Sequence, residues 1–176
     1  MSLKEATSNN HVLAEQHPFI KLLISGTMSE YIYAEFLYNQ YVAYLTLENL
    51  AESNNLLDNI IDIKRADFIQ KDLQELSFTD LKIYPSTNKY VQHIKLLDSQ
   101  SLLAHLYVRH MGDMYGGQAI KKKIPGTGTM YEFIDRNNLI KCLREKLSDN
   151  LATEANLCFT MILELFTEIS NEHNIQ

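Results

Sequence analysis

Apolar residues recur at intervals of three or four positions along most of the chain, a spacing that predicts amphipathic helices. No stretch alternates apolar and polar residues for long enough to predict a strand. The expected fold class is therefore all-α, with about seven or eight helices. The predicted helices cover residues 3–24 (one helix, or two in tandem), 29–52, 56–63, 64–76, 87–97, 101–123, 131–147 and 152–171.

Glycine, proline and capping residues mark the breaks between these helices. Pro18 lies near a joint in the first segment, and Gly26 is a stop signal at its end. Ser29 and Thr87 are each in the position of an N-cap, whose side chain accepts a backbone N–H of the first turn. The sequence Pro-Gly-Thr-Gly at residues 125–128 ends the helix that precedes it.

Length and composition are those of one soluble globular domain. With 176 residues, 45% hydrophobic and 22% charged, residues 1–176 are expected to form a single domain with a short polar tail after about residue 170. A net charge of −6 argues against broad nucleic-acid binding, and no apolar run approaches the roughly 18 residues of a membrane span. Cys142 and Cys158 form no metal-binding motif and fit a reducing compartment, so a cytoplasmic location is expected.

The most unusual segment is the helix predicted over residues 101–123, because three glycines interrupt it, at positions 112, 116 and 117. Each glycine inside a helix costs up to about 1 kcal/mol relative to alanine, so a compensating gain is expected. Gly112 and Gly116 share one helix face, where a backbone bare of side chains can approach something bulky or flat. Arg109 and Asp113, also four positions apart, form a paired charge on nearly that face.

Common catalytic templates are missing from the chain. It contains no His-Glu-x-x-His, no phosphate-binding Gly-x-x-x-x-Gly-Lys-[Ser/Thr], and no Glu-x-x-His of the kind that di-iron helical bundles use. The glycine-bearing helix therefore needs another explanation. A planar cofactor on the glycine face suggests heme, which takes an axial ligand on its other side, most often histidine.

Among the six histidines, His11 has the best surroundings for an axial ligand. Glu15 lies one turn further along the same helix, where its carboxylate can accept the N–H of the second ring nitrogen and fix the tautomer. The alternative is an exposed histidine with a helix-spaced acid, which from spacing alone is the more common arrangement.

Three stretches of the sequence are together similar to one known family. Residues 3–7, then His11 and Glu15, resemble the opening helix of heme oxygenases. Tyr38-x-x-Tyr41 followed by a glutamate resembles their second helix, and residues 103–118 resemble their distal-helix signature. The resemblance extends from residue 3 to about residue 169.

This resemblance implies a role for each residue of the site. His11 becomes the iron ligand of heme b, and Glu15 becomes the acid that orients it. The backbone that lies over the macrocycle falls on Gly112, Gly116 and Gly117. The network that delivers protons to dioxygen falls on Asp113, Arg109 and Tyr41. Contacts to the propionates and to the apolar part of heme fall on Lys4, Tyr107, Arg144, Phe159 and Phe166.

Heme oxygenases use dioxygen to open heme, so the resemblance also implies the products: biliverdin (the α isomer by family default), carbon monoxide and ferrous iron. Ser8 stands where many members have lysine, which leaves the rotation of heme and hence the isomer open. Electrons must come from a partner, such as ferredoxin or a similar reductase, because the chain has no flavin or iron–sulfur motif. A downstream bilin reductase is a further possible partner. Lys121-Lys122-Lys123 is either a dock for an acidic donor or a solvated basic helix end.

Two other functions stay open at this point. A heme carrier or sensor of the same fold would bind heme without turnover. A helical scaffold, or a thiamin-degrading relative with a similar layout, would have no heme role and would need a nucleophilic cysteine; Cys142 and Cys158 lie in apolar helical contexts that look structural.

Overall fold

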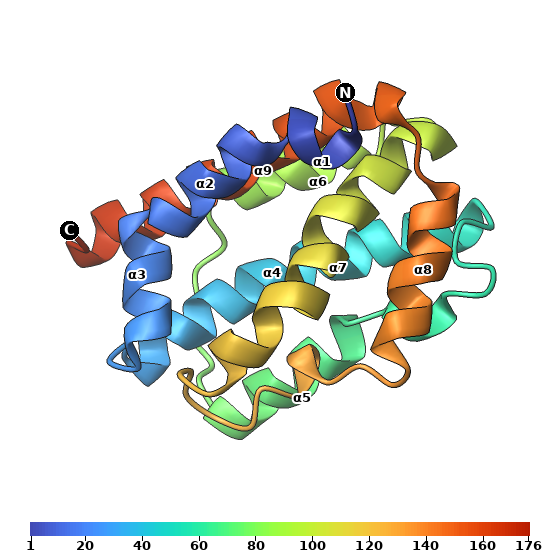
Figure 1. Cartoon of the computed structure of the whole chain (residues 1–176). Helices are drawn as coiled ribbons and strands as arrows, with labels where there is room; N and C mark the ends of the chain where they lie inside the picture. The colour runs from blue at the N-terminus through green and yellow to red at the C-terminus, as the bar shows by residue number, and fades with distance from the viewer.

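The computed structural model describes residues 1–176 and contains helices but no strands (Figure 1). Its nine α-helices are α1 (Leu3–Ala6), α2 (Ser8–Gln16), α3 (Pro18–Ser25), α4 (Glu30–Ser53), α5 (Ala66–Leu76), α6 (Pro85–Ile94), α7 (Ser99–Lys121), α8 (Arg136–Lys146) and α9 (Ala152–His173). Three short 3₁₀ helices are η1 (Ile61–Ile63), η2 (Thr129–Tyr131) and η3 (Asp149–Leu151). The predicted all-α class is confirmed, and the count is close to the seven or eight expected.

The first predicted helix is divided into three, which accounts for the larger count. Thr7 lies between α1 and α2, and His17 lies between α2 and α3. Pro18 takes the first position of α3, where its missing N–H has no helical partner to lose. The N–H of Phe19 donates to Nδ1 of His17 at 3.2 Å. Gly26 ends α3 at φ +80°, a left-handed conformation that suits glycine.

Two predicted elements are wrong in detail. Residues 56–63 form turns followed by η1, because Asn55 and Asn59 adopt positive φ and interrupt any helix there. The helix predicted from residue 131 begins at Arg136, because Asp135 also has a positive φ.

A third error concerns the start of α6. Thr87 was predicted to cap this helix, but the helix begins at Pro85 with Tyr84 as its N-cap. The hydroxyl of Thr87 donates instead to Oδ1 of Asn39 at 2.7 Å. The side chain of Thr87 therefore bonds to α4 and does not cap α6.

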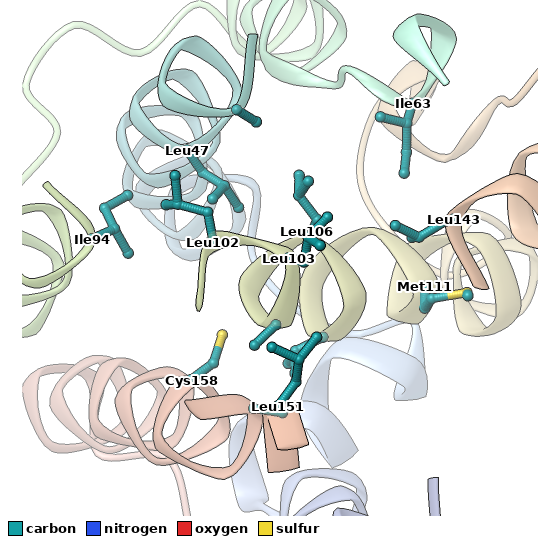
Figure 2. Packing of buried hydrophobic residues seen from close by; sticks show 14 of the residues in the cluster. Leu47, Ile63, Ile94, Leu102, Leu103, Leu106, Met111, Leu143, Leu151 and Cys158 are labelled. Carbon is teal, nitrogen blue, oxygen red and sulfur yellow. The ribbon is translucent and has the colours of Figure 1, made fainter. Parts of the chain in front are cut away.

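Helix α7 lies at the centre of the molecule and contacts α4, α8 and α9 (Figure 1). Figure 2 shows Leu102 of α7 facing Leu47 of α4, while Met111 lies beside Leu143 of α8. Leu102, Leu47 and Leu143 are at most 1% exposed. A second core cluster is built on aromatic rings, with Phe19 5.0 Å from both Phe36 and Phe166. The first cluster contains the buried apolar residues of α7, whereas the second joins α3, α4 and α9.

The last helix is longer than predicted. Helix α9 runs to His173, so it includes residues that were expected to belong to a polar tail after about residue 170. Nε2 of His173 lies 2.6 Å from Oε2 of Glu35, so the end of the chain is tied to α4. None of the helices is both long and apolar enough to span a lipid bilayer.

Candidate functional site

The outer face of α7 carries a strip of bare backbone. Gly112 and Gly116 are exposed, and a Cβ atom placed on either would meet no other atom within 4 Å. They lie one helical turn apart, so the strip is continuous. Two glycines cost helix stability here without making room for any neighbouring protein atom. This strip can accept a flat ligand directly against the backbone.

Helix α2 offers an imidazole and, on its own, very little packing. It contains no buried residue, which is unusual for a helix of a globular protein. The side chain of His11 is 57% exposed, and its Nδ1 lies 3.5 Å from Oε1 of Glu15. The edge of the ring faces Phe159, with the ring centroids 6.2 Å apart. Glu15 can hold the Nδ1–H, which leaves the Nε2 lone pair free for a metal.

The N-terminal helices are connected to α7 on both sides of the glycine strip. Oγ1 of Thr7 lies 3.5 Å from Oη of Tyr107, and Gly26 at the end of α3 lies against Lys123, just past the end of α7. Gly112 and Gly116 fall between these two connections on α7. The segment that carries His11 lies between the same two connections on the N-terminal side. The imidazole and the bare backbone can therefore border one ligand.

Beside the glycine strip, the polar residues of α7 that face α4 and α6 (called here its inner side) form a largely buried network. The hydroxyl of Tyr44 donates to Oδ2 of Asp113 at 2.5 Å. Burial raises the pKa of Asp113 to about 6, above the usual aspartate value. Arg109 is buried, donates from Nη1 to Oε1 of Gln40 at 2.9 Å, and lies 4.1 Å above the ring of Tyr90. The predicted ion pair between Arg109 and Asp113 is wrong, since each charge is held by α4 or α6 instead.

The hydroxyl on Asp113 is that of Tyr44, and the prediction that named Tyr41 is corrected here. Tyr41 is half-buried and packs on the aromatic cluster around Phe19. The two tyrosines are three positions apart on α4, so their directions differ by only about 60°. Helical spacing alone cannot choose between them, and the packing of α4 against α7 decides.

Gly117 serves packing rather than the exposed strip. It is buried, and a Cβ atom there would lie 2.4 Å from Cδ1 of Tyr131 in η2. The prediction that grouped Gly117 with the ligand-facing glycines is corrected accordingly. Its missing side chain makes room for an aromatic ring of the protein itself.

The three residues predicted to meet propionates lie toward one end of this site. The N–H of Leu3 donates to Oδ1 of Asp149 at 3.0 Å, which places Lys4 near the end of α8. Tyr107 is next to α1 through its contact with Thr7, and Arg144 is on the last turn of α8. Their roles toward a ligand stay predictions.

Arg144 also lines an open hollow between α7 and α8. Its Nη2 donates to Oη of Tyr115 at 2.7 Å, and Arg136, Ile140 and Lys141 line the same hollow. Three cations and one carboxylate, that of Glu145, line the hollow, and this excess of positive charge favours an anionic group.

Of the two predicted apolar contacts, Phe159 borders His11 whereas Phe166 lies in the second core cluster. Phe166 stacks on Phe19 at 5.0 Å and lies 5.6 Å from the ring of His17. His110 is buried, with Nε2 3.0 Å from Oε1 of Glu48. It therefore packs inside the protein and does not compete for a ligand on the glycine face.

The features of this site fit heme. A porphyrin is flat, as the bare strip requires, and its iron takes a histidine nitrogen such as the free Nε2 of His11. The sequence missed Tyr44, Gln40 and Tyr90. All three are polar or aromatic residues on helix faces that pack against α7. No short sequence motif marks such residues, because their role depends on which helices meet.

Comparisons with known proteins point to one family. A family model described as heme oxygenase matches residues 1–168. The chain is 29% identical to a heme oxygenase of Guillardia theta over 202 residues, covering 96% of this chain and 85% of that protein. It is 30% identical to a heme oxygenase of Porphyra purpurea over 201 residues, with the same coverage of 96% and 85%.

Solved structures agree with the sequence comparisons. The crystal structure of heme oxygenase-1 from the cyanobacterium Synechocystis in complex with heme has a TM-score of 0.85 and 25% identity, covering 97% of this chain and 91% of that one. A heme oxygenase from Leptospira interrogans has a TM-score of 0.81 and 29% identity, covering 96% of this chain and 100% of that one.

Proposed function

This chain belongs to the heme oxygenase family, and on that premise we propose that it opens heme to biliverdin with dioxygen and external electrons, releasing carbon monoxide and ferrous iron. The observation that carries the proposal is the pairing of an exposed bare strip at Gly112 and Gly116 with an oriented imidazole at His11. The two glycines cost helix stability and no protein atom fills the space they leave, so a ligand accounts for them, and His11 supplies a donor beside it.

We expect heme to bind between the glycine strip of α7 and the side chain of His11 on α2. His11 would supply the nitrogen that binds the heme iron, and Glu15 would favour the tautomer that leaves Nε2 free. Gly112 and Gly116 let the backbone lie against the macrocycle. Lys4, Tyr107 and Arg144 are the proposed partners of the propionates. When bound, heme supplies the iron that activates dioxygen and the ring that is oxidised.

Proton delivery is the proposed task of the inner network. With a pKa raised to about 6, Asp113 exists in both protonation states near neutral pH, as a proton carrier requires. Tyr44 holds the carboxylate oxygen Oδ2. Arg109, one turn before Asp113 on α7, is held by Gln40 and by the ring of Tyr90. The network can therefore hand on protons without reorganising.

Electrons are proposed to come from ferredoxin or a similar reductase, and the bilin to pass to a bilin reductase. The exposed Lys122 and Lys123 support a basic dock for an acidic donor, whereas Lys121 is paired with Glu132. Two free cysteines, Cys142 and Cys158, support a reducing, cytoplasmic location.

An aerobic assay tests this function. Purified protein is mixed with heme, reduced ferredoxin and air, and absorption spectra are followed by chromatography of the pigment. Loss of the Soret band with appearance of a bilin is the expected result. A Soret band that forms and persists would identify a carrier or sensor instead, and no Soret shift at all would exclude a heme role.

A further inference from the structure

Three helices bring two imidazoles and one carboxylate together about two turns before the glycine strip along α7. Nε2 of His93 lies 2.6 Å from Oε1 of Glu154, and Nε2 of His105 lies 2.8 Å from the same oxygen. The three donor atoms all lie within 4.8 Å of one another. His93 is near the end of α6, His105 is in the second turn of α7, and Glu154 is in the first turn of α9.

We propose that His93, His105 and Glu154 form a binding site for a divalent transition-metal ion, separate from the heme site. Two imidazole nitrogens and one carboxylate oxygen are the donor set that Zn²⁺ and Fe²⁺ use, with further positions left to water. Mg²⁺ and Ca²⁺ prefer oxygen donors and are disfavoured here. None of the three residues belongs to the group assigned to heme.

Other histidine–glutamate contacts in the molecule differ from this one. Glu48 contacts His110 but also accepts two backbone N–H groups at the start of α5. Glu35 contacts His173 and also accepts the hydroxyl of Tyr84. Glu154, in contrast, has only the two imidazoles as hydrogen-bond partners. Its carboxylate has no other structural task, so it is available to an ion.

The surroundings suit a metal in two further respects. The hydroxyl of Tyr90 lies 3.2 Å from Nδ1 of His105, the kind of outer contact that orients a metal-bound imidazole. The side chain of His105 is fully buried, while those of His93 and Glu154 are 25% and 19% exposed. An ion can therefore enter from solvent and still meet one rigidly held ligand.

The two nitrogen–oxygen distances need only a small change to admit the ion. Donors bound to Zn²⁺ at about 2.0–2.1 Å in tetrahedral geometry are roughly 3.3 Å apart. The nitrogen–oxygen distances here are 2.6 and 2.8 Å, with a proton in the place of the metal. Side-chain rotation of His93 and Glu154, both close to helix ends, opens the remaining half ångström or so.

Zinc binding to the full chain without heme tests the proposal. Zn²⁺ is titrated in competition with a chromophoric chelator, and Co²⁺ is added separately to read the ligand field by its visible absorption. One ion per chain is expected. His93→Gln and Glu154→Gln should each weaken zinc binding by about 100-fold or more, because a lost ligand costs at least as much as a lost outer contact.

Two controls identify the site. His173→Gln removes a histidine that is 19% exposed and lies 2.6 Å from its own glutamate, so zinc affinity should not change. His11→Ala should also leave it unchanged, which separates this site from the heme site and from failure of the proposed function. If Glu154→Gln does not fold, as judged by circular dichroism, the more exposed His93→Gln decides.

The proposal is overturned if the unmodified chain binds Zn²⁺ no more tightly than His93→Gln, or if His11→Ala rather than His93→Gln abolishes binding. An anaerobic Fe²⁺ titration of the same variants shows whether the site prefers Fe²⁺ or Zn²⁺. Tight Fe²⁺ binding lost in His93→Gln would link the site to the iron that ring opening releases, an extension that rests on the proposed function. Selective Zn²⁺ binding would assign it to zinc.

Discussion

Neighbouring positions on α7 have contrasting characters, although Gly112 and Asp113 are consecutive in the chain. Gly112 and Gly116 face open space, and a side chain added there would touch nothing. Asp113 and Arg109 face α4 and α6, where Tyr44 and Gln40 hold them. The glycines are left open to a ligand, and the charged residues beside them are held by other helices of the protein.

This difference indicates how the site divides its work. The exposed strip can bind a large flat molecule because no atom must be displaced to admit it. Among the residues that face α4, burial raises the pKa of Asp113 to about 6, although the hydrogen bond from Tyr44 lowers it. Binding and proton control therefore belong to adjacent residues of one helix, and substitutions can separate them.

The largest effect is expected from removing the nitrogen that faces the exposed strip. His11→Ala should lower the rate of bilin formation by about 100-fold or more, because heme loses its axial ligand. Bilin formation is measured by absorption in the aerobic assay. His17→Ala, which removes another histidine of the N-terminal segment, should retain turnover. Wild-type turnover in His11→Ala would show that the ligand is another residue.

On the inner side, Asp113→Ala should leave heme binding intact and reduce bilin yield by about 100-fold, the usual scale for a lost proton-transfer group. Tyr44→Phe should reduce it by about tenfold, because the carboxylate keeps its place but loses its hydrogen bond. Soret titration and bilin yield are measured for each variant.

Tyr41→Phe is the matched control for Tyr44→Phe, since it removes a hydroxyl from the same helix. It should give normal yield. A large loss in Tyr41→Phe with none in Tyr44→Phe would return the network to the assignment made from the sequence.

Replacing each of the adjacent glycines Gly116 and Gly117 with alanine should change the free energy of unfolding in opposite directions. Gly116→Ala should stabilise the heme-free protein by about 0.5–1 kcal/mol, because it removes a helix-interior glycine and meets no neighbour. Gly117→Ala should destabilise it by about 1–3 kcal/mol, because its Cβ collides with the buried ring of Tyr131. Urea unfolding measures both; equal changes of the same sign would mean that the two glycines share one environment.

The smallest effect concerns pH. The pKa of Asp113 in the folded protein, about 6, is above its unfolded value, so folding favours the protonated acid. The contribution of this residue to stability is therefore greatest below pH 4 and is lost as pH rises through 6. The difference in unfolding free energy between Asp113→Asn and the unmodified chain should widen in favour of the variant over this range, as measured by urea unfolding of the heme-free protein. A constant difference between pH 4 and 8 would contradict the raised pKa.

The sequence by itself determined the local features. Spacing and caps located most of the helices, including the break at Pro18, the stop at Gly26 and the cap at Ser29. Glycines one turn apart indicated a bare face on α7, and His11 with Glu15 indicated an oriented imidazole. These depend on residues close in the chain, whose relative positions the helix geometry dictates.

Only the tertiary structure decided which distant residues meet. In the folded chain Tyr44, not Tyr41, contacts Asp113, and Gly117 packs against Tyr131. His93, His105 and Glu154 come together from three helices. A period of 3.6 residues specifies the face on which a side chain lies, but the partner of that face depends on how the helices pack. Packing is settled by the fit of many side chains at once, and no short stretch of sequence records it.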